Sequence, residues 1–377
     1  MGMDHSGQNL FDTKRVNRAR IYNLIREKGN VSRKELAYTL QLSLPTVNQN
    51  LSELMEDGYI RESGLVGKTV GRRATVYSIC EDVRVAIGID ITKNHIIIVC
   101  VNLNGQAIYR KKVRRLFERS SQYSKYLSEL VDETVECLKL KEEQVTGVGI
   151  AVPGLITLEG DKIFYGKSLN FTGMTCKELA GFIPYEAELY NDADAAGYAE
   201  AHIGNVIPDS FYVSLNNSVG GAILINGQVY RGERAKSGEI GHMTLEPEGE
   251  PCFCGQKGCL DVYCNATVLS EHTDGDLGAF FESLNRGDQE CMDIWENYLR
   301  YLALGINNIR MLFDCKIILG GYVGAYLEPY LEELKKRVIE KNPFEKESDY
   351  LKICKVKGEA SAMGAALPFV QKVIDQI

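Results

Sequence analysis

The chain lacks any long hydrophobic run, and no apolar stretch approaches the roughly 20 residues that a transmembrane helix needs. Residues 1–9 are polar and lack the apolar core of a secretory signal, so we expect a cytoplasmic protein. In that compartment the 11 cysteines predict reduced thiols or metal ligands rather than a disulfide framework. A chain of 377 residues is too long for one ordinary core and predicts two or three domains.

Positive charge is scarce over the chain as a whole, whose formal net charge is −8. The first 80 residues nevertheless carry 12 lysines and arginines against 8 acidic residues, whereas the rest carries 31 against 43. A mildly basic head on an acidic body indicates that only the head meets a polyanion. Solvated surfaces also produce such asymmetry by chance, so the charge pattern needs support from motifs.

The head shows three helical patterns followed by two strands. Ser32 and Ser43 are predicted N-caps, and Glu35 completes a capping box with Ser32. The expected helices and strands cover residues 13–28, 32–40, 43–57, 59–62 and 75–79. A basic, glycine-containing loop joins the two strands. This order is typical of a winged helix-turn-helix.

The third helix buries an apolar face and leaves short polar side chains on its first turns. Asn and Gln side chains can pair bidentately with adenine in the major groove, and basic loop residues can hold phosphates or enter the minor groove. The predicted DNA-binding residues are Ser43, Thr46, Asn48, Gln49, Lys68, Arg72 and Arg73. The alternative is a three-helix protein-interaction domain with a solvated charged loop. The ordered combination of helices, turn and basic wing favours DNA.

From residue 85 the pattern becomes strand-rich. A strand-strand-strand-helix-strand order occurs twice, beginning at residues 85 and 211, which predicts two similar lobes with a cleft between them. The expected units are a head (1–82), a first lobe (83–205), a second lobe (206–358) and a C-terminal helix (359–377) packing back on the first lobe.

A compact set of soft ligands lies in the second lobe. The four residues, within 18 positions, are His242, Cys252, Cys254 and Cys259. Gly255 and Gly258 permit the reversal that brings three thiolates together, and one His with three Cys makes a closed tetrahedral zinc set. We therefore expect one structural zinc per chain. The alternative is a cluster of reduced cysteines on an exposed loop.

Several segments resemble one known family. They are IGID (87–90), VPG (152–154), YNDADAAGYAE (190–200), GGAILINGQVYRG (220–232), GEIGHM (238–243), CFCGQKGCLD (252–261) and ILGG (318–321). In residues and order they resemble the ROK family, named for repressors, open reading frames and kinases. The resemblance implies an α/β fold: a winged helix-turn-helix followed by a two-lobed, actin-like (ribonuclease H-like) sugar-kinase-type domain. It also implies the repressor branch, which includes xylose and N-acetylglucosamine regulators.

Both phosphate loops depart from the kinase pattern. Family kinases carry Asp-x-Gly-Gly-Thr, but here Asp90 is followed by Ile-Thr-Lys-Asn (91–94). The second loop, Gly-Thr-Gly in the kinases, matches Asn-Asn-Ser at 216–218. Side chains thus occupy positions where the backbone must approach phosphate closely, which predicts that the protein is not an enzyme.

The resemblance implies a retained sugar site. Asp192 follows Asn191 as the kinases' base does, and Asp261 stands where the family usually has Glu, which moves the acceptor by about 1.5 Å. The predicted sugar-binding residues are Asn191, Asp192, Glu239, His242, Asp261 and Asn170. The simpler alternative is that Asn191 and Asp192 only cap the helix that follows them.

These features together predict a sugar-responsive repressor of carbohydrate-utilisation genes. Its effector would be a monosaccharide in the interlobe cleft, with xylose or glucose as first candidates. Its partner would be operator DNA, bound as a homodimer or tetramer. Two alternatives remain: an active sugar kinase with a DNA-binding head, which the altered loops oppose, and a DNA-binding protein whose body is only a dimerisation scaffold, which the sugar-site residues oppose.

Overall fold

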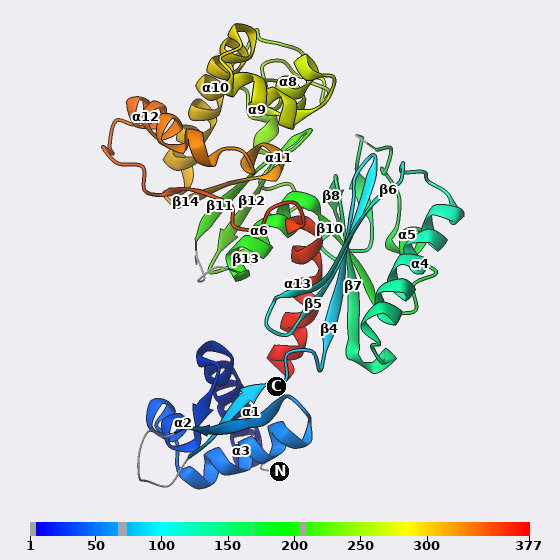
Figure 1. The fold of residues 1–377 in the computed structure, drawn as a ribbon, viewed down its shortest axis with the longest axis vertical. Helices are drawn as coiled ribbons and strands as arrows, with labels where there is room; N and C mark the ends of the chain where they lie inside the picture. Colours follow the sequence, from blue (N-terminus) through cyan, green and yellow to red (C-terminus); the bar gives the residue numbers. More distant parts are fainter. Residues whose placement is uncertain (1–4, 67–73, 168, 204–208) are drawn as a thin grey trace.

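The computed structural model describes residues 5–66, 74–167, 169–203 and 209–377 (Figure 1). A small N-terminal unit lies at one end of the molecule, and a two-lobed α/β body forms the rest (Figure 1). Among the described residues, no helix combines the length and the apolar character needed to cross a membrane.

The N-terminal unit is a winged helix-turn-helix. It contains α1 (His5–Lys28), β1 (Val31–Ser32), α2 (Arg33–Leu40), α3 (Leu44–Glu56), β2 (Ile60–Val66) and β3 (Ala74–Ile79). Strand β3 pairs antiparallel with both β1 and β2. The Oγ atoms of Ser32 and Ser43 accept hydrogen bonds from the N–H groups of Glu35 and Thr46, so both predicted N-caps are confirmed. The predicted capping box is wrong, because the Glu35 carboxylate accepts a hydrogen bond from Lys28 Nζ rather than from the N–H of Ser32.

Three elements of this unit differ from the prediction. Strand β2 continues to Val66 rather than ending at residue 62. Helix α1 begins at His5 rather than near residue 13, because its first turns carry no apolar stripe that a pattern could reveal. Strand β1 is only two residues long, too short for any alternation, and is defined by its pairing with β3.

The first lobe is a five-stranded sheet in the order β10-β7-β4-β5-β6. Its elements are β4 (Val85–Ile91), β5 (His95–Asn102), β6 (Ala107–Arg114), α4 (Ser121–Leu138), β7 (Val145–Val152), β8 (Leu155–Ile156), β9 (Ile163–Tyr165), α5 (Cys176–Ala180), β10 (Ala187–Asn191) and α6 (Asp192–Ile203). The central strand β4 is buried along its whole length, whereas the edge strand β6 alternates between half-buried and exposed residues. A continuous apolar run therefore marks the middle of the sheet.

The second lobe repeats this arrangement, with strand order β13-β12-β11-β14-β15. Its elements are β11 (Ser210–Leu215), β12 (Val219–Ile225), β13 (Gln228–Val229), α7 (Leu260–Cys264), α8 (Ala266–Ser270), α9 (Leu277–Asn285), α10 (Gln289–Phe313), β14 (Lys316–Gly320), α11 (Gly321–Gly324), α12 (Leu331–Lys341) and β15 (Leu351–Ile353). In each lobe the first three strands are antiparallel and the last two run parallel to the first. The predicted pair of similar lobes is confirmed.

Helices α6 and α13 (Ala360–Gln376) lie side by side between the two sheets (Figure 1). Gly88 and Gly149 are neighbours across β4 and β7, and a Cβ on either would fall within 2 Å of a carbonyl oxygen of α13. Gly364 allows the equally close approach of α13 to α6. Helix α13 thus packs on the first lobe through paired glycines that leave no room for side chains.

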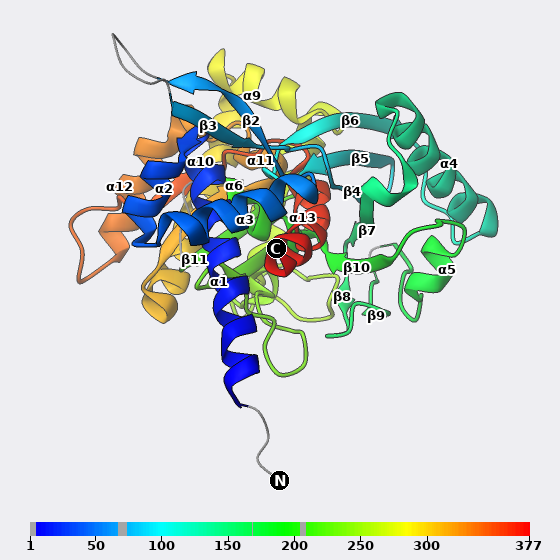
Figure 2. The same cartoon turned by 90° about the horizontal axis from the view of Figure 1, so that it is seen from below.

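Helix α13 also reaches the DNA-binding unit. Ile377, which follows its last turn, is buried, and Figure 2 shows this end of α13 beside α1 and α3. The two parts are joined further by the N–H of Leu103, which donates to Glu81 O at 2.9 Å, and by Asn102 Nδ2, which donates to Asp82 Oδ1 at 3.1 Å.

Candidate functional site

The outer face of α3 is the candidate DNA-reading surface. Val47, Leu51 and Leu54 pack into the core of the unit. The residues exposed on the opposite face, spaced by three and four positions, are Pro45, Asn48, Gln49, Ser52 and Glu56. The predicted residues Asn48 and Gln49 therefore lie on one exposed face. Ser52 was not predicted, although it lies four residues after Asn48.

The start of α3 holds two further predicted residues. Ser43 is exposed and Thr46 is half-buried, and their hydroxyl oxygens lie 2.8 Å apart. Gln49 Nε2 donates to Glu53 Oε1 at 3.2 Å, an exposed bond that a nucleotide base could replace. The predicted wing residues Lys68, Arg72 and Arg73 lie outside the described residues.

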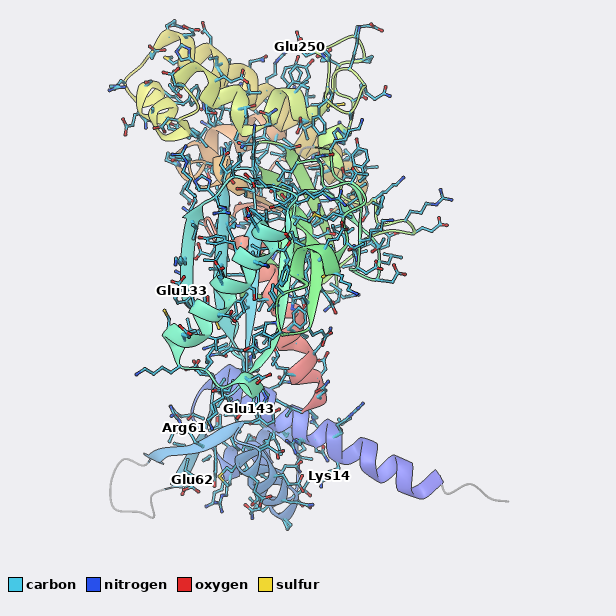
Figure 3. The ribbon with its side chains drawn as sticks, turned by 90° about the vertical axis from the view of Figure 1, so that its right-hand side faces the viewer. Lys14, Arg61, Glu62, Glu133, Glu143 and Glu250 are labelled. Atoms are coloured by element: carbon cyan, nitrogen blue, oxygen red, sulfur yellow. The ribbon has the colours of Figure 1, made fainter. Side chains whose placement is uncertain are left out.

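The four predicted metal ligands meet in the second lobe. The ligand atoms of His242, Cys252, Cys254 and Cys259 all lie within 4.8 Å of one another. Figure 3 places Glu250, in the loop between the first two of these ligands, at the far end of the molecule from Lys14, Arg61 and Glu62 of the DNA-binding unit.

The donor atoms fit a tetrahedral zinc ion. Zinc–sulfur bonds of about 2.3 Å predict sulfur–sulfur separations of about 3.8 Å, and sulfur–nitrogen separations of about 3.6 Å. Cys254 Sγ lies 3.8 Å from Cys259 Sγ, and Cys252 Sγ lies 3.7 Å from His242 Nδ1. Gly258 has a positive φ of 67°, and Glu246 O would lie only 1.6 Å from a Cβ there, so the turn between the thiols requires glycine.

A small chamber of about 90 Å³ lies between the lobes. Asn191 and Asp192 line it from the start of α6, and Glu239 and His242 line it from the loop after β13. Since His242 Nδ1 faces the thiols, zinc ligation there leaves the proton on Nε2, which can then donate to a ligand. Four of the six predicted sugar-binding residues converge here.

The carboxyl groups of this chamber hold their protons more tightly than usual. Loss of solvent raises the pKa of Asp192 to about 6, against hydrogen bonds from the backbone. The pKa of Glu239 rises to about 7 because the lobes displace water around it and because Asp192 carries a like charge. Such groups exchange easily between accepting and donating hydrogen bonds near neutral pH.

Asn191 has a structural role as well. Its Oδ1 accepts the N–H of Asp194 at 2.9 Å, which caps α6, and its Nδ2 donates to Gly154 O at 3.0 Å. The helix-capping alternative thus holds for Asn191. Asp192 Oδ1 accepts the N–H of Ala193 at 3.0 Å.

Asp261 and Asn170 do not line the chamber. The buried Asp261 Oδ1 accepts hydrogen bonds from Ser218 Oγ at 2.9 Å and from Val219 N at 2.6 Å. Its short side chain therefore holds the loop at residues 216–218 in place. Asn170 lies in an exposed turn with a positive φ of 58°, a conformation that Asn tolerates better than most residues.

A larger chamber of about 350 Å³ adjoins the small one. Its walls include the two altered loops, at 90–93 and 216–218, together with Tyr322 from α11 and Ser361 from α13. Asp90 lies buried in its wall, where burial and the neighbouring Asp192 raise its pKa to about 7. The pattern of the sequence did not reveal Tyr322 as part of this wall.

Arg231 is another site residue that the sequence did not reveal. It extends from the second lobe and donates to the carbonyl oxygens of residues 156–158 in the first, at 2.7–3.2 Å. Its Nε also lies 3.8 Å from Asp194 Oδ2 on α6. Arg231 therefore links the two lobes beside the small chamber.

A winged helix-turn-helix joined to a two-lobed, sugar-kinase-type body defines a DNA-binding transcriptional regulator. Residues 86–372 match the ROK family, and residues 16–61 match the winged helix-turn-helix DNA-binding family. The chain therefore belongs to the ROK family.

Named relatives agree with this assignment. The xylose repressor of Caldicellulosiruptor bescii is 24% identical over 385 residues, which cover 93% of this chain and 94% of the relative. The DNA-binding transcriptional dual regulator NagC of Escherichia coli strain K12 is 26% identical over 337 residues, 84% and 82% of the two chains. The crystal structure of a ROK family transcriptional regulator, a homologue of the E. coli MLC protein, shares the fold with a TM-score of 0.73, 22% identity and 97% coverage of both chains.

Proposed function

We propose that the protein is a sugar-responsive repressor of carbohydrate-utilisation genes, acting in the cytoplasm. Helix α3 and the wing would bind operator DNA, and the monosaccharide unit of an effector would bind in the small chamber. The observation that carries this proposal is the convergence of Asp192, Glu239 and His242 on one chamber. The donors beside that chamber are already used within the protein, because Ser218 Oγ donates to Asp261 and the N–H of Tyr322 donates to Asn216. Xylose and glucose are the first candidates, in line with relatives named as xylose repressors.

Hydrogen bonding around the loops argues against sugar kinase activity. A kinase must offer free backbone N–H groups to the phosphates of ATP. Here the N–H of Tyr322 donates to Asn216 Oδ1 at 2.8 Å, and the N–H of Val219 donates to Asp261 Oδ1. Side chains of the protein thus occupy donors that a phosphate would need. We propose a binding protein without kinase activity.

The remaining parts support regulation. A structural zinc held by His242 and the three thiols would fix the loop that carries Glu239 and His242. One winged helix buries too little surface for tight, specific binding, so we propose a homodimer, or a tetramer built from it, on a two-fold operator.

The decisive experiment is an operator-affinity titration with xylose and glucose in the wild type and in Asp192→Ala. We expect the sugar to weaken operator binding in the wild type. Each lost hydrogen bond to a charged group costs about 1.5–3 kcal/mol, so the variant should need at least tenfold more sugar. Its operator affinity without sugar should be unchanged. Asp349→Ala, an exposed aspartate outside the cleft, is the matched control.

Two results would contradict the proposal. If Asp192→Ala responds at the same sugar concentration as the wild type, the effector binds elsewhere. Sugar-dependent ATP consumption at about 1 per second or faster would instead indicate an active kinase, provided that Asp192→Asn abolishes it and so excludes a contaminant.

A further inference from the structure

The two chambers of the cleft lie next to each other. Pro153, Asp192, Ser214 and Ser218 line both of them, so the chambers meet at these residues. The larger chamber, about 350 Å³, has about four times the free volume of the small one, about 90 Å³. A ligand confined to the small chamber would leave most of the cleft filled with water alone.

The walls of the larger chamber suit an uncharged polar group with an apolar face. Leu169, Tyr322 and Val356 line this chamber with apolar surface. Asn217 and Ser361 offer an amide and a hydroxyl group, whereas the hydroxyl protons of Thr92 and Thr267 are donated to His95 O and Asn265 Oδ1. Sugar rings present this combination of C–H faces and hydroxyl edges, and ligand pockets typically combine apolar walls with a few polar groups.

The same walls are poorly suited to phosphate. The N–H groups at the start of α11 already have partners, because Gly321 N donates to Tyr212 Oη at 3.2 Å and Tyr322 N to Asn216 Oδ1 at 2.8 Å. Two carboxyl groups, Asp90 and Asp192, line the chamber, against Lys93 as the one cation among its described lining residues. The first two N–H groups of the short helix α11 are therefore already engaged and would have to give up these bonds to bind an anion.

We infer that the effector is a glycoside of at least two units, in which a sugar ring in the small chamber carries a second neutral unit, a further sugar or an aglycone, in the larger chamber. The bond between the units would pass the junction beside Asp192 and Ser214. This inference rests on the proposed function, because it assumes that the first ring binds in the small chamber. The second unit would displace the water that a monosaccharide leaves behind, which favours binding when that water is poorly ordered.

Calorimetric titration of the full-length protein tests the inference. The ligands are xylose with xylobiose, glucose with cellobiose and gentiobiose, and glucose 6-phosphate as the anionic comparison. Ser361→Phe fills the larger chamber from α13 without touching the small one, and Ser361→Ala is its matched control. Thr267→Phe fills the same chamber from α8 and covers the case in which Ser361→Phe does not fold.

We expect at least one disaccharide to bind tenfold or more tightly than its monosaccharide. Ser361→Phe should remove this advantage, should leave monosaccharide affinity within twofold, and should not change operator binding without sugar. Equal affinity for the paired sugars, or a disaccharide affinity unaffected by both filling variants, would overturn the inference while the proposed function stands. Tighter binding of glucose 6-phosphate that the filling variants abolish would also overturn it. If none of the sugars binds, the proposed function fails with it.

Discussion

Asp90 is a buried carboxyl group at a position where the family's kinases place their first phosphate loop. It is only 8% exposed, and none of the ion pairs among the described residues includes it. Its pKa is raised from 3.8 to about 7 by burial and then by Asp192, while Lys112 lowers it. A folded-state pKa above the unfolded value means that the stability contributed by the protonated group is complete below pH 4 and is lost as the pH rises to about 7.

Asp90→Asn should therefore stabilise the protein in a pH-dependent way. The neutral amide never ionises, so we expect a gain in the free energy of unfolding on the order of 4 kcal/mol at pH 8, and of about 2 kcal/mol at pH 5. Urea denaturation at the two pH values measures it, with the exposed Asp349→Asn as control. If the gain is the same at both pH values, or absent at pH 8, ionisation of Asp90 does not destabilise the protein.

The four residues that we propose as zinc ligands give a second prediction about single residues. Cys254→Ser should reduce the metal content from about one zinc per chain to none and should lower the melting temperature, because metal binding and folding of the loop are coupled. Elemental analysis and thermal unfolding measure the two effects. Cys137→Ser, at an exposed cysteine far from the cluster in sequence, should change neither. Freshly purified, unchelated protein without zinc would rule the site out.

Among the elements, α3 is the one that we propose reads the operator sequence. Gln49 lies on its exposed face with a replaceable hydrogen bond to Glu53, so Gln49→Ala should lose one base contact. A bidentate base contact contributes about 1–3 kcal/mol of discrimination, so the ratio of operator to scrambled-DNA affinity should fall roughly 5- to 150-fold. Competition binding measures that ratio. Gln106→Ala, on the body, is the control, and an unchanged ratio in Gln49→Ala would remove Gln49 from the reading surface.

Elements with strong local signals were predicted well from the sequence. The capped helices α2 and α3 and the buried strand β4 are examples, because a cap or an unbroken apolar run is a local property.

The residues of the site could be predicted only where their spacing in the sequence brings them together. The His and Cys ligands lie within one short segment, and their spacing predicts their meeting. The contacts of Asp261 and Arg231 depend on loops 40 to 75 residues away, at Val219 and Ile156, whose approach is a property of the folded lobes. No local pattern encodes such a contact.

At the scale of the whole molecule, the two lobes must stay together for one sugar to touch both. Asp192 lies at the start of α6 in the first lobe, and Glu239 lies in the second. A ligand that contacts both groups binds the closed arrangement better than an open one, and only this difference in affinity can shift the conformation. Helix α13 carries Ser361 of the larger chamber near its start, and its end is followed by Ile377, which is buried at the DNA-binding unit. A change in the arrangement of the lobes would therefore move an element that also contacts the DNA-binding unit.

Arg231 provides a test of this coupling that leaves the sugar contacts intact. Its three hydrogen bonds to residues 156–158 stabilise the closed arrangement, and hydrogen bonds to charged groups contribute about 1.5–3 kcal/mol each. Arg231→Met should therefore favour the open form and reduce sugar affinity at least tenfold, because the sugar must first close the lobes. Calorimetry measures the affinity, and Arg234→Met, at an exposed arginine three residues on, is the matched control.

Operator binding without sugar should be unchanged or tighter in Arg231→Met. Wild-type sugar affinity in this variant would mean that the lobes stay closed without Arg231, and that the sugar acts on the DNA-binding unit by a route other than lobe closure.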